Sequence, residues 1–64
     1  MMVGDRMLTL AAVEERVGLK KSAIYARIAE GNFPKQVNLG GAVRWSELEI
    51  DEWIEAQKRA RRAA

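Results

Sequence analysis

The sequence contains no cysteine, no histidine and only one proline. Without cysteine there can be no disulfide or thiolate metal site, and without histidine the commonest general base and nitrogen metal ligand are missing. No apolar run approaches the roughly 18 residues of a membrane span, and no signal-peptide pattern opens the chain. We therefore expect no metal, no cofactor and no membrane contact, and a cytoplasmic location.

Charge is segregated along the chain rather than large in sum. The net charge is only +2. Residues 16–45 nevertheless contain six basic residues and one acid, whereas residues 47–55 contain five acids and no base. A basic cluster follows at Lys58, Arg59, Arg61 and Arg62. A polyanion would be attracted to the basic middle of such a protein, so the charge map favours nucleic acid as a partner.

Apolar residues at helical spacing predict two short helices, one over residues 10–17 and a second that follows Leu19 and ends near Glu30. Thr9 is a suitable N-cap for the first helix, and Gly18 is a suitable end. Two short helices joined by a tight glycine turn form a helix-turn-helix unit.

A hairpin is predicted after this unit, because Phe33-Pro34 cannot continue a helix. Residues 36–39 and 42–45 alternate apolar with polar side chains around Gly40-Gly41, which is typical of a two-residue hairpin loop. Such strands are too short to be stable alone, so we expect them to pack against the helices and form a wing.

A third helix is predicted from the capping box that runs from Ser46 to Glu49. The fold class is therefore mainly α with a small β-hairpin, a winged helix-turn-helix in the order α-α-β-β-α. The expected organisation is an N-terminal arm over residues 1–8, the winged domain over 9–57 and a basic C-terminal tail over 58–64. Phe33, Trp45 and Trp53 fall on apolar faces and are expected in the core rather than in a base-stacking platform.

The outer face of the second helix has low relief, as a helix that enters a DNA major groove requires. Its start carries two lysines and backbone N–H groups that suit phosphate. Residues around the hairpin are expected on the flanking backbone or the minor groove. For Arg27 an ion pair with the acidic third helix is expected instead. The predicted DNA-binding residues are Lys20, Lys21, Ser22, Tyr25, Ala26, Ala29, Lys35, Gln36, Asn38, Gly40, Gly41 and Arg44.

The stretch from Leu10 to Trp53 resembles the AlpA family of prophage regulators, within the wider group of excisionase-like and MerR-like winged-helix proteins. The resemblance is carried by Gly18-Leu19, Ser22-Ala23-Ile24-Tyr25, Gly31-Asn32-Phe33-Pro34, Val37-Asn38-Leu39-Gly40, Val43-Arg44-Trp45 and Ile50-Asp51-Glu52-Trp53. It implies a DNA-binding regulator of a phage or integrated element. Lys20 stands where family members often carry serine, and Ala26 where they often carry a basic residue.

Three functions follow as hypotheses. The first is a transcriptional regulator that binds double-stranded DNA. The second is an excisionase that bends attachment-site DNA for an integrase, and the third is a protein-interaction module whose acidic third helix binds a basic partner. An enzyme is not expected, because the carboxylates lie around a solvated helix with no convergent pocket. One short helix and one wing cover little DNA, so a dimer or a cooperative array of copies is expected.

Overall fold

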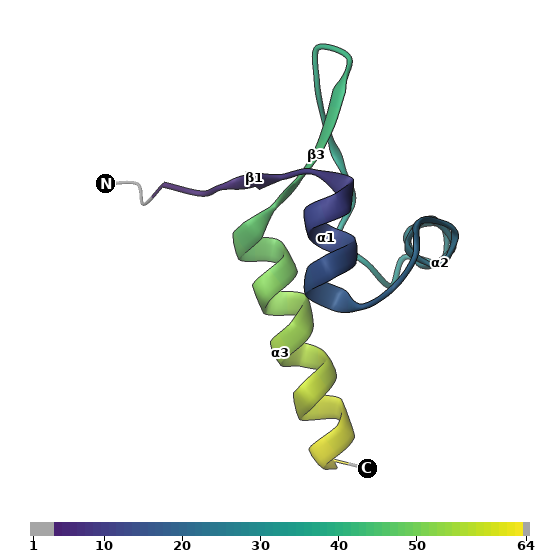
Figure 1. The fold of residues 1–64 in the computed structure, drawn as a ribbon. Helices are drawn as coiled ribbons and strands as arrows, with labels where there is room; N and C mark the ends of the chain where they lie inside the picture. Colours follow the sequence, from purple (N-terminus) through teal and green to yellow (C-terminus); the bar gives the residue numbers. More distant parts are fainter. Residues whose placement is uncertain (1–3, 64) are drawn as a thin grey trace.

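Three helices and three short strands make up the fold of the computed structural model, which describes the backbone of residues 4–63 and the side chains of residues 4–61. The predicted fold class is confirmed, and one short strand is added before the first helix (Figure 1). The elements are β1 (Met7–Leu8), α1 (Leu10–Val17), α2 (Lys21–Ala29), β2 (Val37–Leu39), β3 (Ala42–Ser46) and α3 (Glu47–Ala63).

The predicted helix-turn-helix unit is formed by α1 and α2. The Thr9 hydroxyl accepts a hydrogen bond from the Ala12 backbone N–H at 3.2 Å, which satisfies one free donor at the start of α1. At the other end Gly18 adopts φ 73°, in the left-handed region, and its N–H donates to the Glu14 carbonyl at 2.8 Å. This glycine turns the chain from α1 toward α2 without the steric cost that a side chain would meet.

The predicted wing is also present. β2 and β3 pair antiparallel, and Leu39 lies opposite Ala42 across the loop. Gly40 and Gly41 have φ values of 58° and 97°. A two-residue loop with positive φ at both positions matches the twist of the flanking strands. The Asn38 carboxamide oxygen accepts a hydrogen bond from the Gly41 N–H at 3.1 Å, so this side chain also closes the turn.

The predicted N-terminal arm contains β1, which the sequence did not indicate. Met7 pairs with Ser46 and Leu8 pairs with Trp45, so β3 is the central strand of a three-stranded sheet in the order β1-β3-β2. Leu8 is 8% exposed and belongs to the core. The other buried apolar residues are Val13, Ile24, Phe33, Trp45 and Ile50. Each helix contributes to this core, and Trp45 and Phe33 are buried as predicted.

Two side chains cap the start of α3. The Ser46 hydroxyl accepts from the Glu49 N–H at 3.2 Å, as the predicted capping box requires. The Asp5 carboxylate accepts from the Leu48 N–H at 3.1 Å and from the Ser46 hydroxyl. The Ser46 hydrogen bond, followed by the Leu48 N–H, lowers the pKa of Asp5 below its ordinary value. The chain before β1 is thereby attached to α3.

The helix α3 extends beyond the part of it that packs against the rest of the chain. It continues through residues 58–63, so the segment predicted as a basic tail is helical as far as Ala63. Figure 1 shows its second half projecting away from the sheet, on the side opposite the wing. The wing and α3 thus extend in opposite directions, which accounts for the longest dimension of 40 Å.

Candidate nucleic-acid interface

The outer face of α2 is exposed and carries small side chains. Ser22, Ala26 and Ala29 are exposed, whereas Ile24 on the opposite face is completely buried. Tyr25 lies between these faces, half-buried, with its ring edge-on to Trp45 at a centroid distance of 6.0 Å. The hydrophobic contact holds the Tyr25 ring in place. The remaining face offers small side chains over two turns, a surface that another molecule can approach closely.

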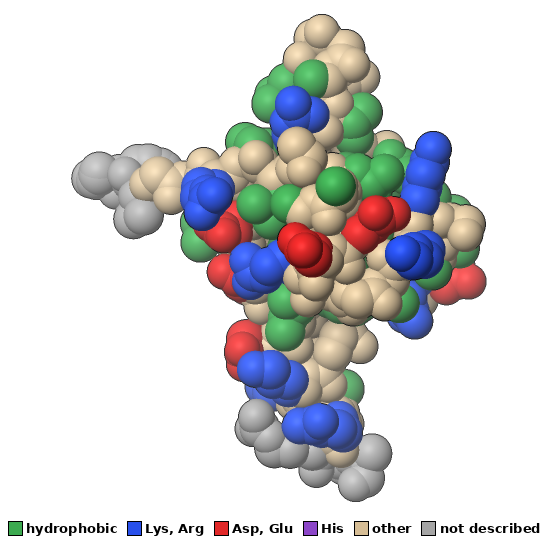
Figure 2. All heavy atoms as spheres, viewed as in Figure 1, with side chains coloured by type: hydrophobic (Ala, Val, Ile, Leu, Met, Phe, Trp, Pro, Cys, Tyr) green, Lys and Arg blue, Asp and Glu red, His purple; other side chains and the backbone are tan. Residues whose placement is uncertain are grey.

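The start of α2 is basic and has no side-chain cap. Lys20 occupies the N-cap position without a capping hydrogen bond, and both Lys20 and Lys21 are exposed. The first N–H groups of a helix have no intrahelical acceptor, and they form the positive end of the helix dipole. Lys20, Lys21, Ser22 and Tyr25 line one shallow hollow of about 570 Å³, which Glu14 of α1 borders as its single acid. Figure 2 shows basic side chains around α2 on the right.

The wing presents an apolar outer face, which the sequence pattern alone does not indicate. Val37 is 38% exposed and Leu39 is 49% exposed. Cross-strand partners share a face of the sheet, so Ala42 and Arg44 lie on this side with them. The alternation in β2 was visible in the sequence, but it could not show that this strand turns its apolar side outward. The Arg44 guanidinium donates to the Val43 carbonyl at 2.8 Å, which holds it close to the wing.

The predicted hairpin residues do not all lie on the surface that α2 presents. Lys35 and Gln36 line an open groove beside α3 instead. The Gln36 side-chain oxygen is buried and has no hydrogen-bond partner among the described residues. Asn38, Gly40 and Gly41 are exposed at the end of the wing. The structure therefore gathers Lys20, Lys21, Ser22 and Tyr25, and it separates Lys35 and Gln36 from them.

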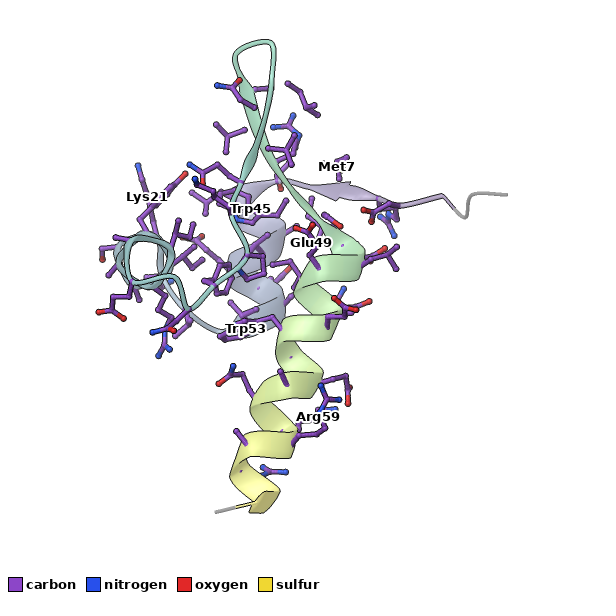
Figure 3. The ribbon with its side chains drawn as sticks, turned by 180° about the vertical axis from the view of Figure 1, so that it is seen from behind. Met7, Lys21, Trp45, Glu49, Trp53 and Arg59 are labelled. Carbon is purple, nitrogen blue, oxygen red and sulfur yellow. The ribbon has the colours of Figure 1, made fainter. Side chains whose placement is uncertain are left out.

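Two tryptophans hold the segment between α2 and the wing. The Trp45 indole N–H donates to the Pro34 carbonyl at 3.2 Å, and the Trp53 indole N–H donates to the Asn32 carbonyl at 2.8 Å. Trp53 also packs edge-on against Phe33 at 4.8 Å between centroids. In Figure 3 both tryptophans lie between α2 and the remaining elements. These contacts fix the wing relative to α2, because they hold the segment that joins them.

The ion pair expected from Arg27 is not formed among the described side chains, so this prediction is wrong. Arg16 of α1 occupies the role instead, at 3.3 Å from the Glu47 carboxylate and in contact with Asp51. Glu47 and Asp51 are one turn apart on α3, so one guanidinium reaches both. Arg27 lines the groove on another side of α3. Together with Glu55, which pairs with Lys58, three of the five acids in residues 47–55 are thus paired within the chain.

No group of three or more carboxylates that could hold a metal ion occurs within the described residues. Over the same part of the chain, no helix is both long enough and apolar enough to cross a membrane.

The helix-turn-helix unit, the hairpin and the final helix together define a small winged helix-turn-helix protein. Residues 6–59 match the protein family described as prophage CP4-57 regulatory protein (AlpA), and the chain belongs to this family. It is 41% identical over 51 residues to an uncharacterized protein, ORF88, of Enterobacteria phage P4. The match covers 78% of this chain and 58% of the phage protein, so the chain spans little more than half of that relative.

A second relative is a DNA-binding transcriptional activator, AlpA, of Escherichia coli strain K12. It is 38% identical over 56 residues, which cover 77% of this chain and 80% of the relative. The matched family region begins at Arg6, just before β1, and ends at Arg59 in α3. It therefore includes every strand and helix start described above.

Proposed function

We propose that this protein binds double-stranded DNA as a transcriptional regulator of a prophage or another mobile element. Family membership supports this proposal, as does the relative named as a DNA-binding transcriptional activator. The structural observation that carries it is the uncapped, basic start of α2 next to an exposed face of small side chains. A phosphate and a base edge can approach such a surface together.

In this proposal α2 lies in the major groove. Lys20, Lys21 and the free N–H groups that follow bind phosphates, which sets the position of the helix on the duplex. Ser22 and Tyr25 supply hydroxyl groups within reach of base edges or phosphates. Ala26 and Ala29 let the helix approach the floor of the groove and can contact thymine methyl groups. This division makes Lys21 a source of affinity and the small-residue face a source of sequence preference.

The wing lies over the flanking backbone or minor groove. Asn38, Gly40 and Gly41 are at its end, and the glycine backbone carries no side chain to hinder close contact. Arg44 lies further back on the same hairpin and is positioned by its bond to the Val43 carbonyl. Lys35 and Gln36 line the groove beside α3, so this proposal gives them no contact with the DNA. Because Trp45 and Trp53 fix the intervening segment, the distance between helix and wing contacts is set before binding.

A gel-shift titration and footprint on DNA from the neighbourhood of the gene test this proposal. The wild type should protect a discrete site, with Kd near 10⁻⁸ M or tighter at physiological salt, as is typical of specific binding. Lys21→Ala should weaken binding to all sequences and lower the magnitude of the salt slope by about one. Tyr25→Phe retains the ring that packs on Trp45 and tests the hydroxyl alone.

The matched control is Lys58→Ala, which removes a lysine from α3 that already pairs with Glu55 at 3.1 Å. It should leave DNA binding unchanged. If Lys21→Ala binds as tightly as the wild type at every salt concentration, α2 does not bind phosphate in the way proposed.

An excisionase would use the same α2 and wing surface, so the bend of the bound DNA separates it from a regulator that reads a site without bending it. Circular-permutation gel shifts on the footprinted site measure that bend. An excisionase also predicts that deletion of the gene abolishes integrase-dependent excision. A protein-interaction module based on α3 is less well supported. Glu47 and Asp51 are already paired with Arg16 and offer less charge to a basic partner.

A further inference from the structure

An open groove of about 1120 Å³ runs between α3 and the segment that follows α2. One wall is basic and contains Arg27 and Lys35, and the other is formed by α3. Glu52, Ala56 and Arg59 lie along that second wall. Trp53, which also lines the groove, lies on the side of α3 that faces α2 in Figure 3. The groove is distinct from the hollow at the start of α2, because the two share no lining residue.

The α3 wall of this groove is complementary to itself. Glu52 and Arg59 are seven residues apart, and seven steps of about 100° bring a side chain back to nearly the same direction. Ala56 lies between them and is small enough for a second helix to approach closely, at the usual interaxial distance of roughly 8–10 Å. In two antiparallel copies of α3 that cross near Ala56, each Glu52 therefore faces the Arg59 of the other copy.

The opposite orientation does not give this match. Two parallel copies of α3 in register would set Glu52 against Glu52 and Arg59 against Arg59, which is repulsive. Glu52 and Arg59 are available for such a contact. Among the described side chains, Glu47 and Asp51 contact Arg16, and Glu55 pairs with Lys58. Glu52 and Arg59 form no ion pair, and neither do Glu49 and Arg61.

We propose that a second copy of this chain docks in the groove, through antiparallel pairing of the two α3 helices around Ala56. The proposal rests on the proposed function in one respect, because the pairing matters for DNA binding only if each copy binds DNA. The wing and the end of α3 point in opposite directions, so antiparallel pairing places the two wings at the two ends of the dimer (Figure 1). Two copies would then contact the DNA at two sites along its length.

The dimer is weak in free solution. A pair of helices in contact over four turns buries much less than the 1,200–2,000 Å² of a stable interface. Pairing is therefore expected at high protein concentration and low salt, and as cooperativity when two sites lie on one DNA molecule. Neighbouring binding sites raise the effective concentration of one copy near the other, so a weak contact becomes measurable there.

Charge reversal tests the pairing directly. Glu52→Arg sets two arginines against each other across the interface, and Arg59→Glu sets two glutamates against each other. Each variant should reduce self-association in sedimentation equilibrium by at least about tenfold. An equimolar mixture of the two variants should associate as a heterodimer, because both cross pairs are then of opposite charge. The double variant Glu52→Arg/Arg59→Glu should associate like the wild type for the same reason.

Lys58→Glu is the matched control for Arg59→Glu. It makes the same change in net charge one residue away, on a side of α3 that does not line the groove, and it should leave self-association unchanged. Far-UV circular dichroism confirms that each variant remains folded, and all of them should bind an isolated single DNA site like the wild type.

Several results overturn the pairing. Self-association that persists in both single reversals places the second copy elsewhere on the surface. A mixture of the single variants that stays monomeric rules out the antiparallel contact. A wild type that is monomeric at several hundred micromolar and binds two adjacent sites without cooperativity leaves the groove to a different protein. If wild type and variants all fail to bind DNA, the proposed function fails, while the sedimentation experiment still decides the pairing.

Discussion

Leu8→Ala tests whether the first residues of the chain are part of the folded unit. Leu8 is 8% exposed and lies opposite Trp45 in the sheet. Leucine to alanine removes three carbon atoms, worth about 2.4 kcal/mol at roughly 0.8 kcal/mol for each buried group. The cavity left behind adds to this, although Leu8 is at the edge of the core, where neighbours can relax. We expect a loss of about 2–4 kcal/mol in the free energy of unfolding.

Such a loss is large for this chain. A domain of 64 residues has a free energy of unfolding of about 3–10 kcal/mol. The melting temperature should fall by roughly 8–32 °C, since 1 kcal/mol shifts it by about 4–8 °C in domains of this size. Urea denaturation followed by tryptophan fluorescence and circular dichroism measures the change, and Trp45 reports directly on the site.

The control is Met7→Ala, the neighbouring residue in the same strand, which is 37% exposed. This change should cost less than about 1 kcal/mol, because surface substitutions usually have small effects. If Leu8→Ala unfolds at the same urea concentration as the wild type, β1 does not contribute to stability and the argument from burial is refuted.

Three further changes test the contacts around the core. Asp5→Asn should make the stability of the protein depend less on pH in acid. The pKa of Asp5 is lowered in the folded state, so its carboxylate stabilises the fold above the ordinary pKa of about 4. This stabilisation is lost as the pH falls through the folded pKa. Melting temperatures between pH 2 and 6 show this, and a profile like that of the wild type would contradict it. Arg16→Gln removes the ion pairs to α3 and should cost less than about 1 kcal/mol, because Arg16 is partly exposed, with no difference left in 1 M salt. The midpoints of urea denaturation of Arg16→Gln and the wild type, compared at low and high salt, measure this difference. Gly41→Ala meets open space, so its cost of about 1–2 kcal/mol comes from backbone strain at φ 97°, and an unchanged melting temperature would argue against that conformation.

The helices and the wing could be predicted because their signals are local. Gly18 and the Gly40-Gly41 pair take the left-handed backbone that only glycine adopts readily, so each marks a turn in the sequence itself. Ser46 precedes Glu49 by three residues and forms the capping bond that this spacing predicts. Ile24 and Ile50 belong to the apolar residues at helical spacing in their segments, and both are completely buried.

The contacts that depend on a distant partner could not be predicted in this way. A strand of two residues such as Met7–Leu8 has no periodicity to detect, and it forms because the edge of β3 is available to it. Asp5 lies 43 residues from Leu48, whose N–H it caps. Arg16 and Arg27 each stand in the last turn of a short helix, and only the packing of α1 beside α3 selects Arg16 for the ion pair.

The predicted DNA-binding residues also differ in whether their position depends on local signals or on distant contacts. Those on α2 follow from the direction of a single helix, so Lys20, Lys21 and Ser22 are found together as expected. Lys35 and Gln36 depend on the path of an irregular segment. That path is set by indole bonds from Trp45 and Trp53, whose acceptors are main-chain carbonyls, and a carbonyl gives no signal in the sequence. Because the same two bonds separate the wing from α2, they turn Lys35 toward the groove beside α3 while they fix the spacing between α2 and the wing. A basic residue near a wing therefore need not point toward DNA, and only the hydrogen bonds of the intervening segment determine which surface it joins.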